Sequence, residues 1–315
     1  MLSIENLYVE FISGNNGSAN SVVAVEGASL RIESGETVAV IGESGSGKSV
    51  MGMAVCRLLP PFALVKGQVF FKEHALLDLP IADIRKIRGE QIAFVPQSAG
   101  LSLNPTMLCA DQVAEVFIHN CNTTRRKARK FTHELMQKLG LGGRVTDSYP
   151  HLLSGGMRQR VLVGIGVAGS PDLLIADEPT KGIDMSRQKD VENLLGQIRD
   201  SNPAMAMLLI THDLRLAEAL ADHVAVMYAG RIVEQTPKKE FFKKPYHPYS
   251  RALLNALPER GLTPIPGVPP HPTDRPAGCI FHPRCSFVSA SCRQSEPPKN
   301  NNNGHLVRCW NYAEV

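Results

Sequence analysis

The segment with the most distinctive chemistry has the pattern G-x-x-x-x-G-K-S and reads Gly42-Glu43-Ser44-Gly45-Ser46-Gly47-Lys48-Ser49. Glycines let backbone N–H groups converge on phosphate oxygens, and a helix that follows them adds the positive end of its dipole. We expect Lys48 to reach the β and γ phosphates of a nucleotide and the Ser49 hydroxyl to bind Mg²⁺. The alternative is a glycine-rich turn that merely contains Lys-Ser.

A pair of carboxylates could supply the hydrolytic chemistry. Asp177 and Glu178 follow the apolar run Leu173–Ala176. Asp177 is expected to hold the magnesium shell, and Glu178 to act as the general base that polarises the attacking water. An apolar strand ending in Asp-Glu is often only structural, but after a phosphate loop it predicts nucleotide hydrolysis.

These side chains require a sheet with its loops on one edge. The strand Thr37–Ile41 runs into the glycine segment, and a helix over Val50–Leu59 follows it. Several strands are apolar on both faces, which favours a central parallel sheet covered by helices and hence an α/β fold. The further predicted strands are Leu2–Phe11, Ser29–Ile32, Gln91–Val95, Leu173–Ala176, Met205–Ile210 and Val224–Tyr228.

Two regions depart from the strand pattern. Residues 98–165 are predicted as a helical subdomain, including a helix over Thr124–Leu139 that stops at Gly140. After Glu234 the chain is rich in proline, which excludes long helices and indicates a loop-rich extension. The expected division is therefore residues 1–235 and residues 236–315.

One segment is similar to a known family. Leu153-Ser154-Gly155-Gly156-Met157-Arg158-Gln159-Arg160 resembles the signature motif of ABC ATPases. Further matches follow in the family's order. Phe11 resembles the adenine-stacking aromatic, Gln97 the glutamine that touches Mg²⁺ or water, Asp184 the D-loop aspartate and His212 the switch histidine at the γ phosphate. For Phe11 the alternative is a buried strand residue.

The resemblance implies an ABC ATPase core built on a phosphate loop. It also implies an antiparallel β subdomain, a helical subdomain and a carboxyl-terminal extension rich in Pro and Cys. In such a pair of subunits, Ser154, Gly155 and Gly156 of one chain donate N–H groups to the nucleotide on the other. ATP binding closes the pair, hydrolysis reopens it, and the motion passes to transmembrane subunits. Gln97, Glu178 and His212 are the implied catalytic residues.

Other segments favour one branch of that family. Ser102-Leu103-Asn104-Pro105 and His247-Pro248-Tyr249-Ser250 resemble segments of oligopeptide and dipeptide importer ATPases. Nickel importers share this branch. The implied partners are two permease subunits, a second and related ATPase subunit and, indirectly, an external solute-binding protein, at the cytoplasmic face of the inner membrane. Departures at Ser98-Ala99 and Lys181-Gly182 spare every implied catalytic side chain.

Four cysteines gather near the carboxyl terminus, at Cys279, Cys285, Cys292 and Cys309. Thiolates on a proline-rich segment with little core suggest a metal staple. Zinc and unligated thiols are the alternatives, whereas the family resemblance implies a four-iron, four-sulfur cluster. The remaining cysteines have the character of ordinary core or surface residues.

Composition excludes several other classes of function. A net charge of +4 over 315 residues, with scattered Lys and Arg, predicts no nucleic-acid partner. The longest apolar runs are shorter than a membrane span, and the amino terminus lacks the features of a secretory signal. Two rival classes are an ABC ATPase acting on nucleic acid and a module that binds ATP without turnover.

Overall fold

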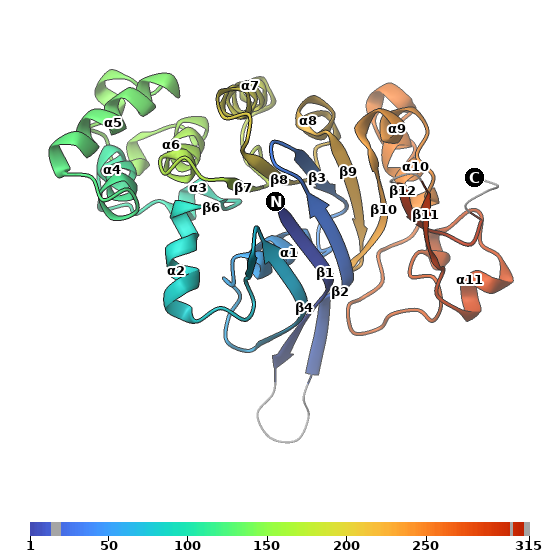
Figure 1. The fold of residues 1–315 in the computed structure, drawn as a ribbon. Helices are drawn as coiled ribbons and strands as arrows, with labels where there is room; N and C mark the ends of the chain where they lie inside the picture. Colours follow the sequence, from blue (N-terminus) through green and yellow to red (C-terminus); the bar gives the residue numbers. More distant parts are fainter. Residues whose placement is uncertain (14–19, 303–304, 312–315) are drawn as a thin grey trace. The chain divides into compact units, whose positions relative to one another are not determined.

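The amino-terminal strand β1 (Leu2–Ser13) has the alternation expected of a strand with one buried face. Leu2, Ile4 and Val9 are buried on that face. The strand lies between β2 (Asn20–Ile32) and β4 (Ala63–Phe71), antiparallel to both, and β5 (His74–Ala75) completes the sheet (Figure 1). β2 is much longer than the predicted Ser29–Ile32, because pairing with β1 extends it.

This computed structural model describes residues 1–13, 20–302 and 305–311. The chain forms two compact units. Unit 1 comprises Met1–Ile32, Thr37–Leu77 and Ile210–Val315, and unit 2 comprises Glu33–Glu36 and Asp78–Leu209.

A second group of strands in unit 1 positions the glycine segment. The fully buried β3 (Thr37–Ile41) pairs in parallel with β9 (His223–Tyr228), and β10 (Arg231–Pro237) returns antiparallel to β9. Helix α1 (Lys48–Val55) follows the glycine segment, and α8 (Leu214–Leu220) packs on β3. α1 begins two residues earlier than predicted because Gly47 is its N-cap.

Unit 2 contains the predicted parallel strands and the helices of the central region. β6 (Ile92–Val95) pairs in parallel with β7 (Leu173–Asp177), and the buried β8 (Ala206–Thr211) leads the chain into unit 1. Four of its helices, α3, α4, α5 and α7, pack against α6, and α2 packs on β6. The bounds of α5 agree with the prediction within one residue at each end. The helices are α2 (Ile81–Glu90), α3 (Ala99–Ser102), α4 (Cys109–His119), α5 (Arg125–Lys138), α6 (Gly155–Val167) and α7 (Met185–Ser201).

In the part of the proline-rich extension that the structure describes, the helices are short and the strands form one hairpin. Its helices are α9 (Lys238–Lys243), α10 (Pro248–Asn255) and α11 (Ala290–Gln294). β11 (Lys299–Asn302) and β12 (His305–Arg308) pair with each other, and β12 adds to the edge of β10. None of the described helices is long and apolar enough to cross a bilayer.

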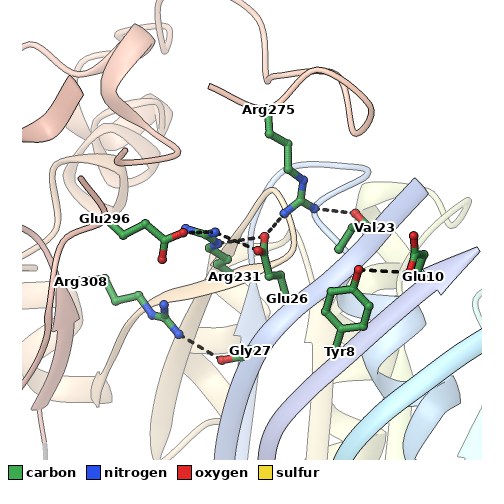
Figure 2. A network of polar contacts seen from close by, with 9 residues as sticks. All are labelled: Tyr8, Glu10, Val23, Glu26, Gly27, Arg231, Arg275, Glu296 and Arg308. Atoms are coloured by element: carbon green, nitrogen blue, oxygen red, sulfur yellow. Dashed lines mark hydrogen bonds and ion pairs between the residues drawn. The ribbon is translucent and has the colours of Figure 1, made fainter. Parts of the chain in front are cut away.

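A network of charges attaches the extension to β2 (Figure 2). Glu26 on β2 accepts hydrogen bonds from Arg231 on β10 and from Arg275 of the extension. Arg231 also pairs with Glu296 at 2.6 Å, while Arg308 donates to the carbonyl of Gly27 at 3.0 Å. Burial alone would raise the pKa of Glu26, but hydrogen bonding and the charges of the arginines outweigh it and lower that pKa.

Candidate functional site

The phosphate loop in unit 1 connects β3 to α1 and needs glycine at two crowded points. Gly42 and Gly47 have φ values of +153° and +100°. A Cβ on Gly42 would lie 2.1 Å from the Met227 carbonyl oxygen, and one on Gly47 would lie 2.4 Å from the Ala24 carbonyl oxygen. Only glycine therefore allows the loop to lie this close to β2 and β9.

The lysine of this loop lies across it. Lys48 is 5% exposed, and its ammonium donates to the carbonyl oxygens of Gly42 at 2.8 Å and Glu43 at 2.9 Å. The Ser46 hydroxyl is 3.4 Å away. Ser44 and Gly45 are exposed at the tip of the loop, and Ser49 is half-buried at the start of α1. This arrangement offers a cation and an open backbone turn to a phosphate, and the residues fit the group predicted from the sequence.

Unit 1 also holds Phe11 and His212. Phe11 is half-buried on β1, beside Val22 of β2, with its ring 6.1 Å from that of Phe62. Its partly exposed ring leaves adenine stacking open to it. His212 is exposed and directly follows β8, next to Asp213, whose carboxylate caps α8 by accepting the N–H of Arg215 at 2.9 Å.

The carboxylate pair lies at the end of β7 in unit 2. Asp177 and Glu178 are 4% and 5% exposed, so both are nearly enclosed by protein. Glu178 has φ +49°, a left-handed backbone that costs a residue with a side chain on the order of 1–3 kcal/mol and is commonest at functional sites. The strained turn directs the chain sharply away from β7 just after Asp177.

The parallel pairing of β6 and β7 brings the glutamine to the same edge. Val95 is in register with Ala176. Gln97 therefore follows β6 at the end of the sheet where Asp177 and Glu178 follow β7. A side-chain amide and two carboxylates at one strand edge are suitable ligands for Mg²⁺ and for water.

The Ser-Gly-Gly segment begins a long helix of unit 2. Ser154 is the N-cap of the 13-residue α6, and Gly155 is exposed while Gly156 is buried. Free N–H groups and the helix dipole make such a terminus suitable for an anion. Asp184, the N-cap of α7, is also exposed.

Arg187 is a residue that the motif analysis did not identify. Its guanidinium donates to the Ser154 hydroxyl at 2.9 Å, and its backbone N–H donates to the carbonyl of Asp184 at 2.8 Å. It thus connects the start of α6 to the start of α7 within unit 2. A hydrogen bond between residues 33 apart leaves no signal in local spacing.

The four carboxyl-terminal cysteines share one neighbourhood in unit 1. Burial is the main cause that raises the pKa of Cys279 and of Cys309 to about 11, and the charges of other cysteines in the group contribute to the same rise. Within the described ranges, no three His, Cys, Asp or Glu side chains are close enough to hold a metal ion. The expected metal site is therefore not formed by these side chains as they stand. Of the other cysteines, Cys56 and Cys109 are buried and Cys121 is exposed.

Comparison with known proteins gives a consistent result. Residues 25–181 match the family description "ABC transporter", and residues 233–292 match "Oligopeptide/dipeptide transporter, C-terminal region". The dipeptide transport ATP-binding protein DppD of Bacillus subtilis is 37% identical over 98% of this chain and 94% of its own length. A Brucella abortus protein described as a peptide import ATP-binding protein is 39% identical with the same coverage.

Solved structures share the fold of the larger part of the chain. A dimeric ATP-binding cassette in a post-hydrolysis state with ADP and phosphate has a TM-score of 0.66 and 25% identity, over 76% of this chain and 99% of that one. The dimeric structure of a bacterial ABC transporter cassette gives the same values.

Proposed function

The chain belongs to the ABC transporter family of ATP-binding proteins and is an ATPase, and from this premise we propose that it powers the import of dipeptides or oligopeptides. The observation that carries the proposal is the pairing of an ATP-binding core with an extension of the oligopeptide and dipeptide type in one chain. The peptide-transport names of relatives that match nearly the whole chain support it.

We assign the steps of hydrolysis to the phosphate loop and to the residues that follow β6, β7 and β8. Lys48 and the backbone N–H groups of Gly45 and Gly47 would hold the β and γ phosphates, with the loop residues Gly42, Ser44 and Ser46 shaping the turn. Mg²⁺, when bound, would neutralise phosphate charge, and Ser49, Gln97 and Asp177 would hold it. Glu178 would accept the proton of the attacking water, and His212 would contact the γ phosphate. Phe11 would stack on the adenine.

A second subunit would complete the site. Ser154, Gly155 and Gly156 at the start of α6 offer N–H donors suited to a phosphate, although the chain already has one such set in its loop. We assign these donors, together with Asp184, to the nucleotide bound by a partner ATPase arranged head to tail. That partner is proposed to be a related but different chain.

The proposed assembly is a membrane transporter. Two permease subunits would receive the motion of the closing ATPase pair, and an external solute-binding protein would deliver the cargo. The chain would lie on the cytoplasmic face of the membrane. Residues 1–235 would form the nucleotide-binding domain, with its helical subdomain at residues 98–165, and residues 236–315 would form the extension.

Purification of the tagged chain from detergent-solubilised membranes tests this assignment. We expect two permeases and a second ATPase to copurify, and reconstituted vesicles to take up labelled dipeptide only with ATP. Uptake of nickel without peptide would reassign the cargo to the alternative within this branch. ATPase activity stimulated by DNA or ribosomes, with no permease copurifying, would favour the rival function on nucleic acid.

We also propose that Cys279, Cys285, Cys292 and Cys309 hold a four-iron, four-sulfur cluster. Their closeness in unit 1 supports this, with Cys279, Cys292 and Cys309 buried and Cys285 half-buried, since a cluster takes four thiolate ligands from one neighbourhood. A single zinc ion would draw its four sulfurs close together, whereas the ligands of a cluster bind separate irons and stand further apart. Anaerobic purification should give about four irons per chain; stoichiometric zinc without iron would contradict the cluster.

A further inference from the structure

Glu43, a residue of the phosphate loop, is held from two directions by the carboxyl-terminal extension. The Arg284 guanidinium donates to both carboxylate oxygens of Glu43, at 2.7 Å and 2.9 Å. The Tyr249 hydroxyl accepts the backbone N–H of Glu43 at 2.9 Å. One loop residue therefore has both its side chain and its backbone fixed by residues more than 200 positions later in the chain.

The Arg284 side chain is itself rigidly placed. It is 4% exposed, against 27% for Glu43. Its Nε donates to the carbonyl of Pro266 at 2.8 Å, and one Nη lies 3.3 Å from the Tyr228 hydroxyl. The hydrogen bond to Glu43 raises the pKa of Arg284, so this guanidinium stays charged. A planar fork that donates to both oxygens of one carboxylate and to two further acceptors is a geometry that lysine cannot reproduce.

Aromatic rings surround this contact. Tyr228 of β9 and Tyr249 of α10 have ring centroids 4.6 Å apart, and Phe281 packs against both at 5.2 and 5.3 Å. Tyr249 and Phe281 belong to the extension, and all three rings are buried. The extension is thus packed firmly beside the loop, and a buried ion pair there is sensitive to loss of either partner.

Glu43 also contacts the loop lysine, Lys48. Its carbonyl oxygen accepts the Lys48 ammonium at 2.9 Å and the Ser46 N–H at 3.3 Å. The same residue therefore contacts the extension through its carboxylate and N–H, and the phosphate-binding lysine through its carbonyl. If the ion pair with Arg284 is lost and Glu43 shifts, the carbonyl oxygen that accepts the Lys48 ammonium shifts with it.

We propose that Arg284 and Tyr249 are positioning residues for nucleotide binding, which act through Glu43 to hold the phosphate loop in its binding shape. The extension would then support the nucleotide site, in addition to distinguishing this branch of the family. The inference rests on the assignment of ATP to this loop. It concerns residues that would not touch the nucleotide themselves.

A double-mutant cycle on the full chain tests the proposal. The variants are Arg284→Gln, Arg284→Lys, Glu43→Gln, Tyr249→Phe and the Glu43→Gln/Arg284→Gln double variant. The probe is Mg-ATP, titrated by displacement of a fluorescent ATP analogue, and KM and kcat are measured in the assembled transporter. Arg308→Gln is the matched control because Arg308 anchors the same extension to Gly27 without contacting the loop.

We expect Arg284→Gln to weaken Mg-ATP binding by roughly three- to thirtyfold, with KM raised more than kcat is lowered. Arg284→Lys should recover part of the loss, and the double variant should bind no more weakly than the worse single variant. Arg308→Gln should lower the melting temperature without changing the affinity. Tyr249→Phe removes only a hydroxyl, so this variant should fold and should lose less affinity for Mg-ATP than Arg284→Gln.

Equal affinities for Arg284→Gln and Arg308→Gln, or strictly additive effects of Glu43→Gln and Arg284→Gln, would overturn the proposal. If Arg284→Gln does not fold, unchanged affinity in both Glu43→Gln and Tyr249→Phe would overturn it instead. Failure of the unmodified chain to bind Mg-ATP would refute the ATP assignment itself. The two failures are therefore distinguishable.

Discussion

Among single residues, Glu178 has the most unusual combination of properties. Its backbone is left-handed, its carboxyl group is buried, and it directly follows the aspartate assigned to Mg²⁺. A protein keeps such strain where the surrounding structure compensates for it and the geometry serves a purpose. The strained turn lets two consecutive side chains at one strand end take different tasks.

Replacing Glu178 with Gln should therefore stop turnover without preventing ATP binding. Loss of a general base typically costs about 10²- to 10⁴-fold in rate, while the amide keeps the size of the side chain. Steady-state phosphate release and analogue displacement measure the two effects. Asp190→Asn, a neutral substitution of an exposed carboxylate on α7, is the control and should retain full activity. Unchanged hydrolysis in Glu178→Gln would mean that another group is the base.

At the scale of elements, α10 depends on a buried histidine at its N-cap. His247 is 2% exposed, and its Nδ1 accepts the Tyr249 N–H at 3.1 Å, with Pro248 at the first helical position. Burial lowers the pKa of His247 from 6.5 to about 3. The neutral ring is required, because a protonated Nδ1 could not accept this bond.

Acid should therefore destabilise the fold through His247. Below pH 6.5, His247 binds a proton in the unfolded state but stays neutral in the folded state. The fold therefore loses stability as the pH falls from 6.5 towards 3. Between about pH 7.5 and pH 5.5 the loss from this group is about 1.4 kcal/mol, measurable by urea unfolding. His247→Asn keeps a capping side chain without the titration and should remove this part of the slope.

The buried Glu234 changes the stability with pH in the opposite direction, so the contribution of His247 must be measured as the difference between the unmodified chain and His247→Asn. Burial raises the pKa of Glu234, whose carboxylate accepts the N–H groups of Tyr246 and His247. Its contribution therefore weakens as the pH rises. Identical pH dependence in His247→Asn and the unmodified chain would contradict the assignment of the slope to His247.

The elements that could be predicted were those with a strong local pattern in the sequence. The phosphate loop lies between β3 and α1, and both were found because strand, loop and helix are contiguous. β4, β10 and the β11–β12 hairpin were not predicted. β4 pairs with the distant β1, whereas β9–β10 and β11–β12 are local hairpins whose short strands, such as the polar Lys299–Asn302, lack clear apolar alternation. The Arg284–Glu43 pair joins residues 241 apart and left no local signal. The same holds for the bond from Arg187 to Ser154.

For the molecule as a whole, the charged network of Figure 2 determines how firmly the extension is attached to β2. Glu26 is the acceptor shared by Arg231 and Arg275, whose side chains are only 10% and 19% exposed. Without this carboxylate, two largely buried guanidinium groups would lose their common partner. A buried cation left without its anion is strongly destabilising.

Glu26→Gln should therefore lower the free energy of unfolding by about 2 kcal/mol, a value reduced for the partial exposure of Glu26. Urea unfolding at neutral pH measures the change. Glu296→Gln removes a carboxylate of the same network that is 56% exposed and should cost less than about 1 kcal/mol. Equal costs for the two variants would contradict the assigned role of Glu26.

The strand β12 has a consequence for the way the protein is made. It pairs with β10, so the edge of β10 can be closed only after the intervening residues 238–304 have been synthesised. Arg284 and Tyr249 likewise emerge long after the glycine turn that they support. If these residues hold the loop as proposed, a nascent chain would bind ATP weakly until Tyr249 and Arg284 have been synthesised and packed beside it.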